Sequence, residues 1–382
     1  MIHSKLIKAL SLGAVLITSS LVKAEPLALN QVIDYALTHE PWLQANKYQQ
    51  QAIEAQSIAA GTLPDPVLTV GLMNLPTDGF AFDQEGMTQF KVGLSQQFSR
   101  GDSLALQQQA LKQSAEQYPW LRADRQAQVK AIVSEAWLNA YRAQKSIQLI
   151  NQDKALFNQL IDITEASYAN TLGATRQQDI IRAQLELTRL EDKLVILEQQ
   201  FDSAKKRLAQ WLPIEMLNGA VSDENTKVTA VMAYQELAPS GVTEVLMNHP
   251  AIIAIDHAMR AKNTQVQVAK EAYKPQFGMN LGYGYRDDTP MGDSRADLFS
   301  IGVSVDLPLF TDNRQDQQVN AAIANAEAVK TNKLITLQKL QGQYFKELSQ
   351  LSRLAQRKAL YQQQLLPQMA EQAEATLNAY TN

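Results

Sequence analysis

Large apolar side chains alternate with small ones in two runs between positions 275 and 310. Most positions between the large residues hold glycine, serine or asparagine. The large residues are Phe277, Met279, Leu281, Tyr283 and Tyr285 in the first run, and Phe299, Ile301, Val303, Val305 and Leu307 in the second. A period of two predicts strands with two unlike faces. At about ten residues, each strand is long enough to cross an outer membrane, with lipid on the apolar side. A soluble hairpin is the alternative.

The chain contains an internal duplication, in which equivalent residues of the two halves are 209 positions apart. Eight pairs lie on this one ungapped diagonal: Leu37/Leu246, Pro41/Pro250, Ala45/Ala254, Pro66/Pro275, Leu72/Leu281, Phe90/Phe299, Gly93/Gly302 and Ser95/Ser304. The first half therefore predicts a matching hairpin, with strands at about 66–75 and 88–99, before those at about 275–285 and 298–308. Four strands do not close a membrane barrel, whose smallest form has about eight, so a barrel would be shared between subunits.

Apolar residues at heptad spacing predict long coiled-coil helices between the hairpins. We expect helices at about 102–168 and 174–211, with the chain reversing near Gly173, and another at about 313–380. Pro119 and Pro367 are expected kinks. Shorter helices are predicted at about 30–60 and 240–272, before each hairpin.

The N-terminus predicts export from the cytoplasm. Residues 1–24 begin with Lys5 and Lys8, continue with an apolar run and end in Val22-Lys23-Ala24, as in a cleaved signal peptide. Removing this segment leaves 32 basic and 39 acidic residues, a net charge of −7, which gives no basis for binding nucleic acid. The chain has no cysteine, which excludes disulfides and thiolate metal sites.

The chain resembles the TolC-like outer-membrane efflux protein family in the order of its predicted elements. That order is helix, hairpin, long helix and return helix, and it occurs twice. The phrases that carry the resemblance are 248–252 (NHPAI), 274–277 (KPQF), 307–310 (LPLF) and 179–187 (DIIRAQLEL). The resemblance divides the chain into the signal peptide 1–24, a first efflux repeat 25–212, a linker 213–239 and a second repeat 240–382. The second repeat stops where the first still has its return helix, so the last helix is expected to be missing.

The resemblance implies a homotrimer in the outer membrane. Its twelve-stranded barrel would receive four strands from each subunit, and the duplicated helices would form a periplasmic α-barrel. Such a duct conducts substrates passively, and its partners are a periplasmic adaptor, an inner-membrane RND pump and outer-membrane lipid. A multidrug or type I secretion channel is one alternative. The phrases 63–66 (LPDP) and 87–90 (MTQF) resemble the heavy-metal, CusC-like branch.

No catalytic or cofactor-binding motif is present, so we expect neither an enzyme nor a bound cofactor. His39 and His249 stand beside the repeated prolines, where capping a helix or facing solvent is favoured over ligating a metal, and His257 is expected on a helix face. Acidic residues gather in the two predicted outer turns, where solvated loops are favoured over a cation vestibule. They are Asp78, Asp83, Glu85, Asp287, Asp288, Asp293 and Asp297. Methionines beside the hairpins are interpreted as filler rather than as soft-metal ligands.

Two other classes of protein share part of this pattern. A periplasmic adaptor also contains a long coiled-coil hairpin. It has only one such hairpin, flanked by soluble β domains, so this class does not account for the duplication. A purely structural coiled-coil protein would not explain the strands. Detergent dependence on extraction separates the channel from both.

The helix turn is the predicted adaptor-contact tip. Its residues are Leu172, Gly173, Ala174 and Thr175. Both adjoining helices carry heptads up to this point, so they expose only their turn. Gly173→Glu is expected to abolish efflux in an export assay while leaving the assembled oligomer intact. Normal efflux would reject the contact, and loss of assembly would favour a glycine that only permits the reversal. In the family the tip glycine commonly follows a tyrosine by three residues, whereas Tyr168 and Gly173 are five apart.

Overall fold

The computed structural model describes residues 27–169, 177–222 and 239–381. The chain divides into two compact units, one formed by residues 1–40 and 128–233 and the other by residues 41–127 and 234–382. The predicted signal peptide and the predicted tip at 172–175 lie outside the described residues. Among the described residues, no helix has both the length and the apolar content that a membrane crossing requires.

The first unit is built on a pair of antiparallel helices. Its described elements are α1 (Leu29–Thr38), α4 (Tyr118–Ala169) from residue 128 onward, α5 (Gln177–Leu208) and the short 3₁₀ helix η1 (Ile214–Asn218). Two ion pairs fix the antiparallel alignment of α4 and α5. Lys154 lies 2.7 Å from Glu191, and Glu135 lies 3.8 Å from Arg207.

The heptad positions of the sequence form the core of this unit. They are buried on α4 at Val129, Val133, Ala136, Ala140, Ala143 and Ile150, and on α5 at Leu194, Ala204 and Leu208. Val32, Ile33 and Ala36 of α1 pack into the same cluster. The coiled-coil prediction is therefore confirmed here, because the 3.5-residue period selects the buried stripe.

Backbone pairing fastens the start of the described chain to α4. Leu27 and Val221 form an isolated parallel bridge. The side-chain amide of Gln144 pairs with both backbone groups of Val221, at 2.9 Å each. The indole N–H of the buried Trp137 donates to the Leu27 carbonyl at 2.8 Å. Polar side chains of one helix thus satisfy backbone groups that would otherwise be buried without partners.

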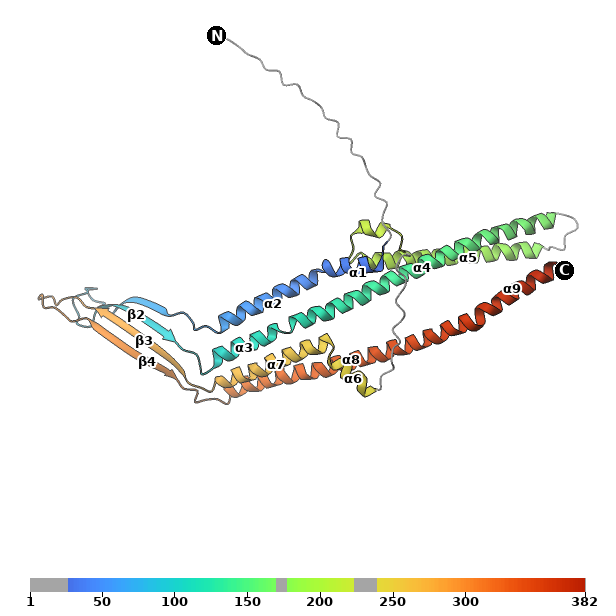
Figure 1. Ribbon diagram of the computed structural model, residues 1–382. Helices are drawn as coiled ribbons and strands as arrows, with labels where there is room; N and C mark the ends of the chain where they lie inside the picture. The colour runs from blue at the N-terminus through green and yellow to red at the C-terminus, as the bar shows by residue number, and fades with distance from the viewer. Residues whose placement is uncertain (1–26, 170–176, 223–238, 382) are drawn as a thin grey trace, which may run out of the picture. The chain divides into compact units, whose positions relative to one another are not determined.

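A four-stranded antiparallel sheet forms one end of the second unit (Figure 1). The strands are β1 (Val67–Met73), β2 (Gln89–Gln97), β3 (Gln276–Tyr285) and β4 (Leu298–Asp306), in the order β1-β2-β3-β4. The two predicted hairpins are therefore confirmed. They join through β2 and β3, so each half of the duplication supplies two neighbouring strands.

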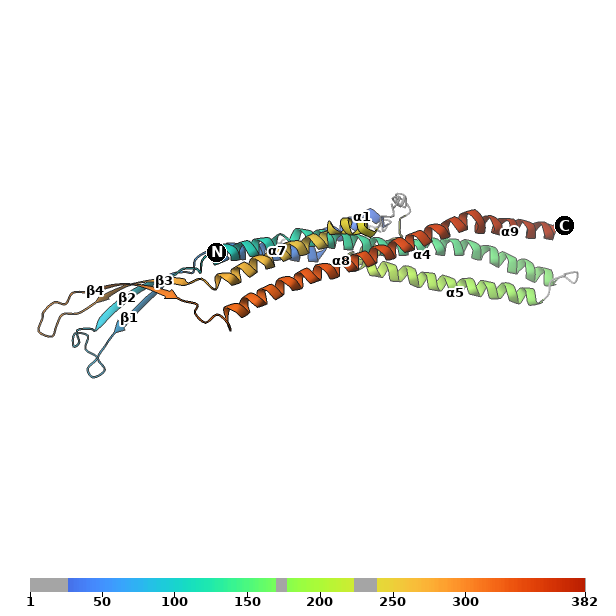
Figure 2. The same ribbon diagram turned by 90° about the horizontal axis from the view of Figure 1, so that it is seen from below.

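Helices of the second unit leave the same end of the sheet and lie side by side in the order α2, α3, α7, α8 (Figures 1 and 2). They are α2 (Pro41–Ala60), α3 (Ser103–Ala115), α7 (Pro250–Glu271) and α8 (Gln315–Leu360). The short α6 (Pro239–Met247) contacts α7 and α8. A π-helical turn, η2 (Tyr361–Leu365), joins α8 to α9 (Leu366–Thr381).

Prolines interrupt helices that the sequence analysis predicts as single segments, with kinks expected at Pro119 and Pro367. The segments at about 30–60 and 240–272 each break before the repeated proline, Pro41 or Pro250, which then opens α2 or α7. The segment at about 102–168 breaks between Ala115 and Tyr118, because Pro119 has no N–H to donate to the preceding turn. Before Pro367 the helix widens instead of breaking, and Leu366 N–H donates to the Tyr361 carbonyl.

Trp137→Ala is expected to lower the free energy of unfolding of the first unit by about 3–5 kcal/mol, since it removes a fully buried aromatic side chain. Chemical denaturation followed by circular dichroism measures the change. The neighbouring Leu138→Ala is the control, because Leu138 is exposed, and it is expected to cost less than about 1 kcal/mol. Equal losses in the two variants would contradict the assigned core.

Candidate functional site: the two-faced sheet and its ends

Strand register places most of the large apolar side chains on one side of the sheet. Paired residues of antiparallel strands share a face, and the register pairs Leu68 with Leu94, Leu94 with Leu281 and Leu281 with Ile301. We call this side the apolar face. It comprises Leu68, Val70, Leu72, Phe90, Val92, Leu94, Phe277, Met279, Leu281, Tyr283, Tyr285, Phe299, Ile301, Val303 and Val305. Phe299 is 73% exposed and Val303 is 71% exposed. A patch of this size marks a surface that meets lipid or another apolar partner.

The opposite side, which we call the small-residue face, carries short side chains in its central part. Its residues are Thr69, Gly71, Lys91, Gly93, Ser95, Gly278, Asn280, Gly282, Gly284, Ser300, Gly302 and Ser304. Gly93 pairs with Gly282 at the junction of the two hairpins. This face is polar without being highly charged, as expected of a wall that lines an aqueous passage.

Charged residues brace the sheet where it meets the helices. The Arg100 guanidinium forms an ion pair with Asp306 and donates to the Lys274 carbonyl at 2.8 Å. The Lys274 ammonium lies 2.6 Å from the Glu271 carboxylate, which also accepts the backbone N–H of Asp102 at 2.8 Å. These contacts tie the β2–α3, α7–β3 and β4–α8 connections together. The hydrogen bond from Lys274 holds the pKa of Glu271 below its ordinary value of 4.5.

Gly101 permits the close approach of these groups. Its φ is +44°, and a Cβ there would lie 2.1 Å from a Glu271 carboxylate oxygen. The positive φ and the lack of space for a Cβ both require glycine at position 101.

Two arginines link the outer loops, residues 74–88 and 286–297, at the opposite end of the sheet. Arg295 donates to the Asp83 carbonyl at 3.1 Å and the Glu85 carbonyl at 3.3 Å. Arg286 donates to the Gly86 carbonyl at 3.1 Å. The Asp297 carboxylate accepts the Arg286 backbone N–H and the Tyr283 hydroxyl, so this acid organises its own loop.

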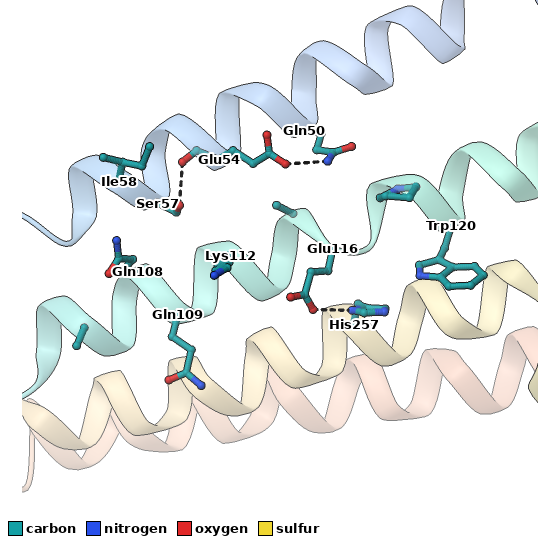
Figure 3. Close-up of a pocket in the computed structure, with 13 residues that line it drawn as sticks. Gln50, Glu54, Ser57, Ile58, Gln108, Gln109, Lys112, Glu116, Trp120 and His257 are labelled. Carbon is teal, nitrogen blue, oxygen red and sulfur yellow. Dashed lines mark hydrogen bonds and ion pairs between the residues drawn. The ribbon is translucent and has the colours of Figure 1, made fainter.

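A cleft of about 860 Å³ lies among α2, α3, α7 and the first turn of α4 (Figure 3). His257 points toward Glu116, and their Nδ1 and Oε2 atoms are 3.0 Å apart. Arg260 Nη2 lies 3.1 Å from the same His257 nitrogen. The contact bridges α7 and the residue that follows α3, so it supports the helix break before Pro119.

Comparisons with known proteins agree with this architecture. The family model described as "Outer membrane efflux protein" matches residues 241–382. The outer membrane efflux protein BepC of Brucella suis is 24% identical over 52% of this chain and 42% of its own length. The outer membrane protein TolC of Vibrio cholerae is 22% identical over 77% of this chain and 67% of its own length. A crystal structure of CusC, 16% identical, covers 92% of this chain with a TM-score of 0.71, and this chain covers 82% of it.

Residues 241–382 are therefore similar to outer membrane efflux proteins. The chain spans less than half of BepC and about two-thirds of TolC. The likeness to CusC shows the TolC-like fold.

The three histidines of the described chain lie at the helix ends and on the helix face that the sequence analysis predicts. One of them, His257, makes a contact that was not predicted. His249 caps α7, and its Nδ1 accepts the Ala251 N–H at 3.3 Å. His39 follows α1, and its Nδ1 lies 2.9 Å from the Tyr35 carbonyl oxygen. His257 is on a helix face as expected, but its pairing with Glu116 was not predicted. Among the described residues, no group of three or more His, Asp or Glu side chains is arranged to hold a metal ion.

Sequence reasoning missed the charges that brace the sheet. Arg100 and Asp306 are 206 positions apart, and Asp306 is the only charge in β4. An isolated charge at the end of an otherwise uncharged strand was the available signal. Its partner follows only from the three-dimensional arrangement of the connections.

Acid is expected to weaken this brace. Because the pKa of Glu271 is depressed, its carboxylate stabilises the fold fully above pH 4.5, and this contribution is lost as the pH falls through the lower, folded-state pKa. Glu271→Gln is therefore expected to lower the melting temperature at pH 7, and the gap to the unmodified protein should shrink below pH 4.5. Glu327→Gln, at an exposed ion pair with Lys330, is the control and should change little. A gap that stays constant from pH 7 to pH 3 would contradict the assignment.

Proposed function

We propose that this chain is a subunit of an outer-membrane export duct that passively conducts substrates from the periplasm to the exterior. The observation that carries the proposal is the two-faced sheet, with large exposed apolar side chains on one side and glycine, serine and asparagine on the other. In lipid this arrangement places the apolar face outward and leaves the small-residue face to line a passage. The names of BepC and TolC as outer membrane proteins support it.

Unpaired strand edges support an oligomer. The strand order leaves the outer edges of β1 and β4 without a neighbour in the described chain. Backbone groups of such edges need partners in lipid. We propose a homotrimer with a shared twelve-stranded barrel, with repeats 25–212 and 240–382 joined by the linker 213–239.

The proposed partners are a periplasmic adaptor and an inner-membrane RND pump. The heptad-packed α4 and α5 supply a rigid helical pair, and the turn at 172–175 is the proposed adaptor contact. A multidrug or type I secretion channel remains the alternative. The heavy-metal branch remains a prediction, since the likeness to CusC concerns the fold.

A matched pair of substitutions on β4 tests which face meets lipid. Val303→Lys puts a charge on the apolar face, where a membrane-embedded lysine costs about 2–4 kcal/mol near the midplane, and it is expected to abolish insertion. Gly302→Lys, one residue away on the small-residue face, should be tolerated, because a Cβ at Gly302 meets no atom within 4 Å. Membrane fractionation, detergent extraction and cross-linking measure insertion and oligomeric state.

Two results would contradict the proposal. One is recovery of the unmodified mature protein in the soluble periplasmic fraction, which would favour an adaptor or a structural coiled coil. The other is normal insertion of the Val303→Lys protein.

A further inference from the structure

Lys91 is an isolated positive charge on the small-residue face. The four strands contain two charged residues, Lys91 and Asp306. Asp306 stands at the helical end of the sheet and is paired with Arg100. Lys91 is third from the start of β2, near the outer loops, and is half-buried.

Glycines make room for the lysine side chain. A Cβ placed on Gly282 would lie 3.0 Å from Lys91 Cε, 3.7 Å from its Nζ and 2.6 Å from the Ser300 hydroxyl oxygen. The lysine of β2 therefore lies across β3, beside a hydroxyl group of β4. Any larger residue at position 282 would displace one or both groups.

A hollow in the sheet adjoins this lysine. It measures about 370 Å³, and its small-residue-face lining is Thr69, Gly71, Met73, Lys91, Gly93, Ser95 and Asn280. The lining thus contains one lysine, two hydroxyl groups and one amide group, and it contains no carboxylate. Cationic and neutral donors together are the chemistry that binds an anion.

The charge of the outer loops has the opposite sign. They hold seven acidic residues, the ones that the sequence analysis assigns to the outer turns, and two basic residues, Arg286 and Arg295. Both arginines donate to loop carbonyl groups. Lys91 thus places a positive charge just inside an acidic rim.

We propose that Lys91 forms an anion-selective station on the small-residue face, where its ammonium and the neighbouring hydroxyl groups attract the carboxylate, sulfate or phosphate groups of exported solutes. This inference rests on the proposed duct and names the class of substrate that the duct favours. Lys91 forms no ion pair with any residue that the structure describes, so its charge opposes metal cations in the passage, and the station argues for anionic solutes over the heavy-metal branch.

Reversal potentials in a planar lipid bilayer test the station. The full chain is reconstituted under a KCl gradient with its dilute side near 0.01 M, where the Debye length is about 30 Å. Lys91→Gln is expected to raise the K⁺ over Cl⁻ permeability ratio by about fourfold for each lysine lost, because one charge at ~10 Å in water changes the permeability of each ion by about twofold and in opposite directions. Lys91→Glu should raise it further, and Lys91→Arg should leave it unchanged. Inorganic sulfate should reduce the current through the unmodified protein and not through Lys91→Gln.

Two further variants separate position from charge. Gly282→Ala keeps the charge but displaces the lysine, so it should shift the ratio in the same direction as Lys91→Gln and by less. Lys330→Gln removes the same charge from an exposed site on α8 and should not shift it. An unchanged ratio in Lys91→Gln, an equal shift in Lys330→Gln, or a sulfate effect that survives Lys91→Gln would overturn the station. Absence of conductance in the unmodified protein would instead contradict the proposed duct.

Discussion

The pairing of β2 with β3 is the constraint on which the rest of the sheet depends. It joins two hairpins from different halves of the chain, with Gly93 opposite Gly282 and Leu94 opposite Leu281. A slip of one residue at this seam would turn the apolar side chains of one hairpin to the small-residue face. The pairing continues toward the helices, where Phe98 N–H donates to the Phe277 carbonyl. The brace around Glu271 then holds the next connection in place.

Duplication explains why two hairpins can share one sheet. Pro41 and Pro250 open equivalent helices, and Phe90 and Phe299 lie on the apolar face of equivalent strands. The copies differ in length, because β1 has seven residues and β3 has ten. Contacts that bind the copies to each other, such as Arg100 with Asp306, use residues that the repeat does not pair. The halves have therefore diverged at this ion pair, while the β2–β3 seam keeps repeated residues such as Gly93 and Leu281.

Periodicity predicted the strands, their faces and the long helices, since burial on one face imposes a period on the sequence. Helix continuity was less predictable. Proline interrupts the helix before Pro119, but before Pro367 it only widens the helix to a π-helical turn. The outcome depends on whether the backbone carbonyl groups of the preceding turn find other hydrogen-bond donors. The setting of Lys91 over Gly282 was also beyond prediction, because it requires the register of β2 against β3. The proposed tip at 172–175 lies outside the described residues.

The π-helical turn at Tyr361–Leu365 changes how α8 and α9 should be compared. One such turn accommodates about one extra residue, and each residue of an α-helix advances about 100° around the axis. Leu337, Tyr344, Leu348 and Leu351 are half-buried on one side of α8. A seven-residue count carried from them past Tyr361 arrives on a different side of α9. A mutational scan of α8 and α9 therefore needs two separate helical wheels, one ending at Leu360 and one beginning at Leu366.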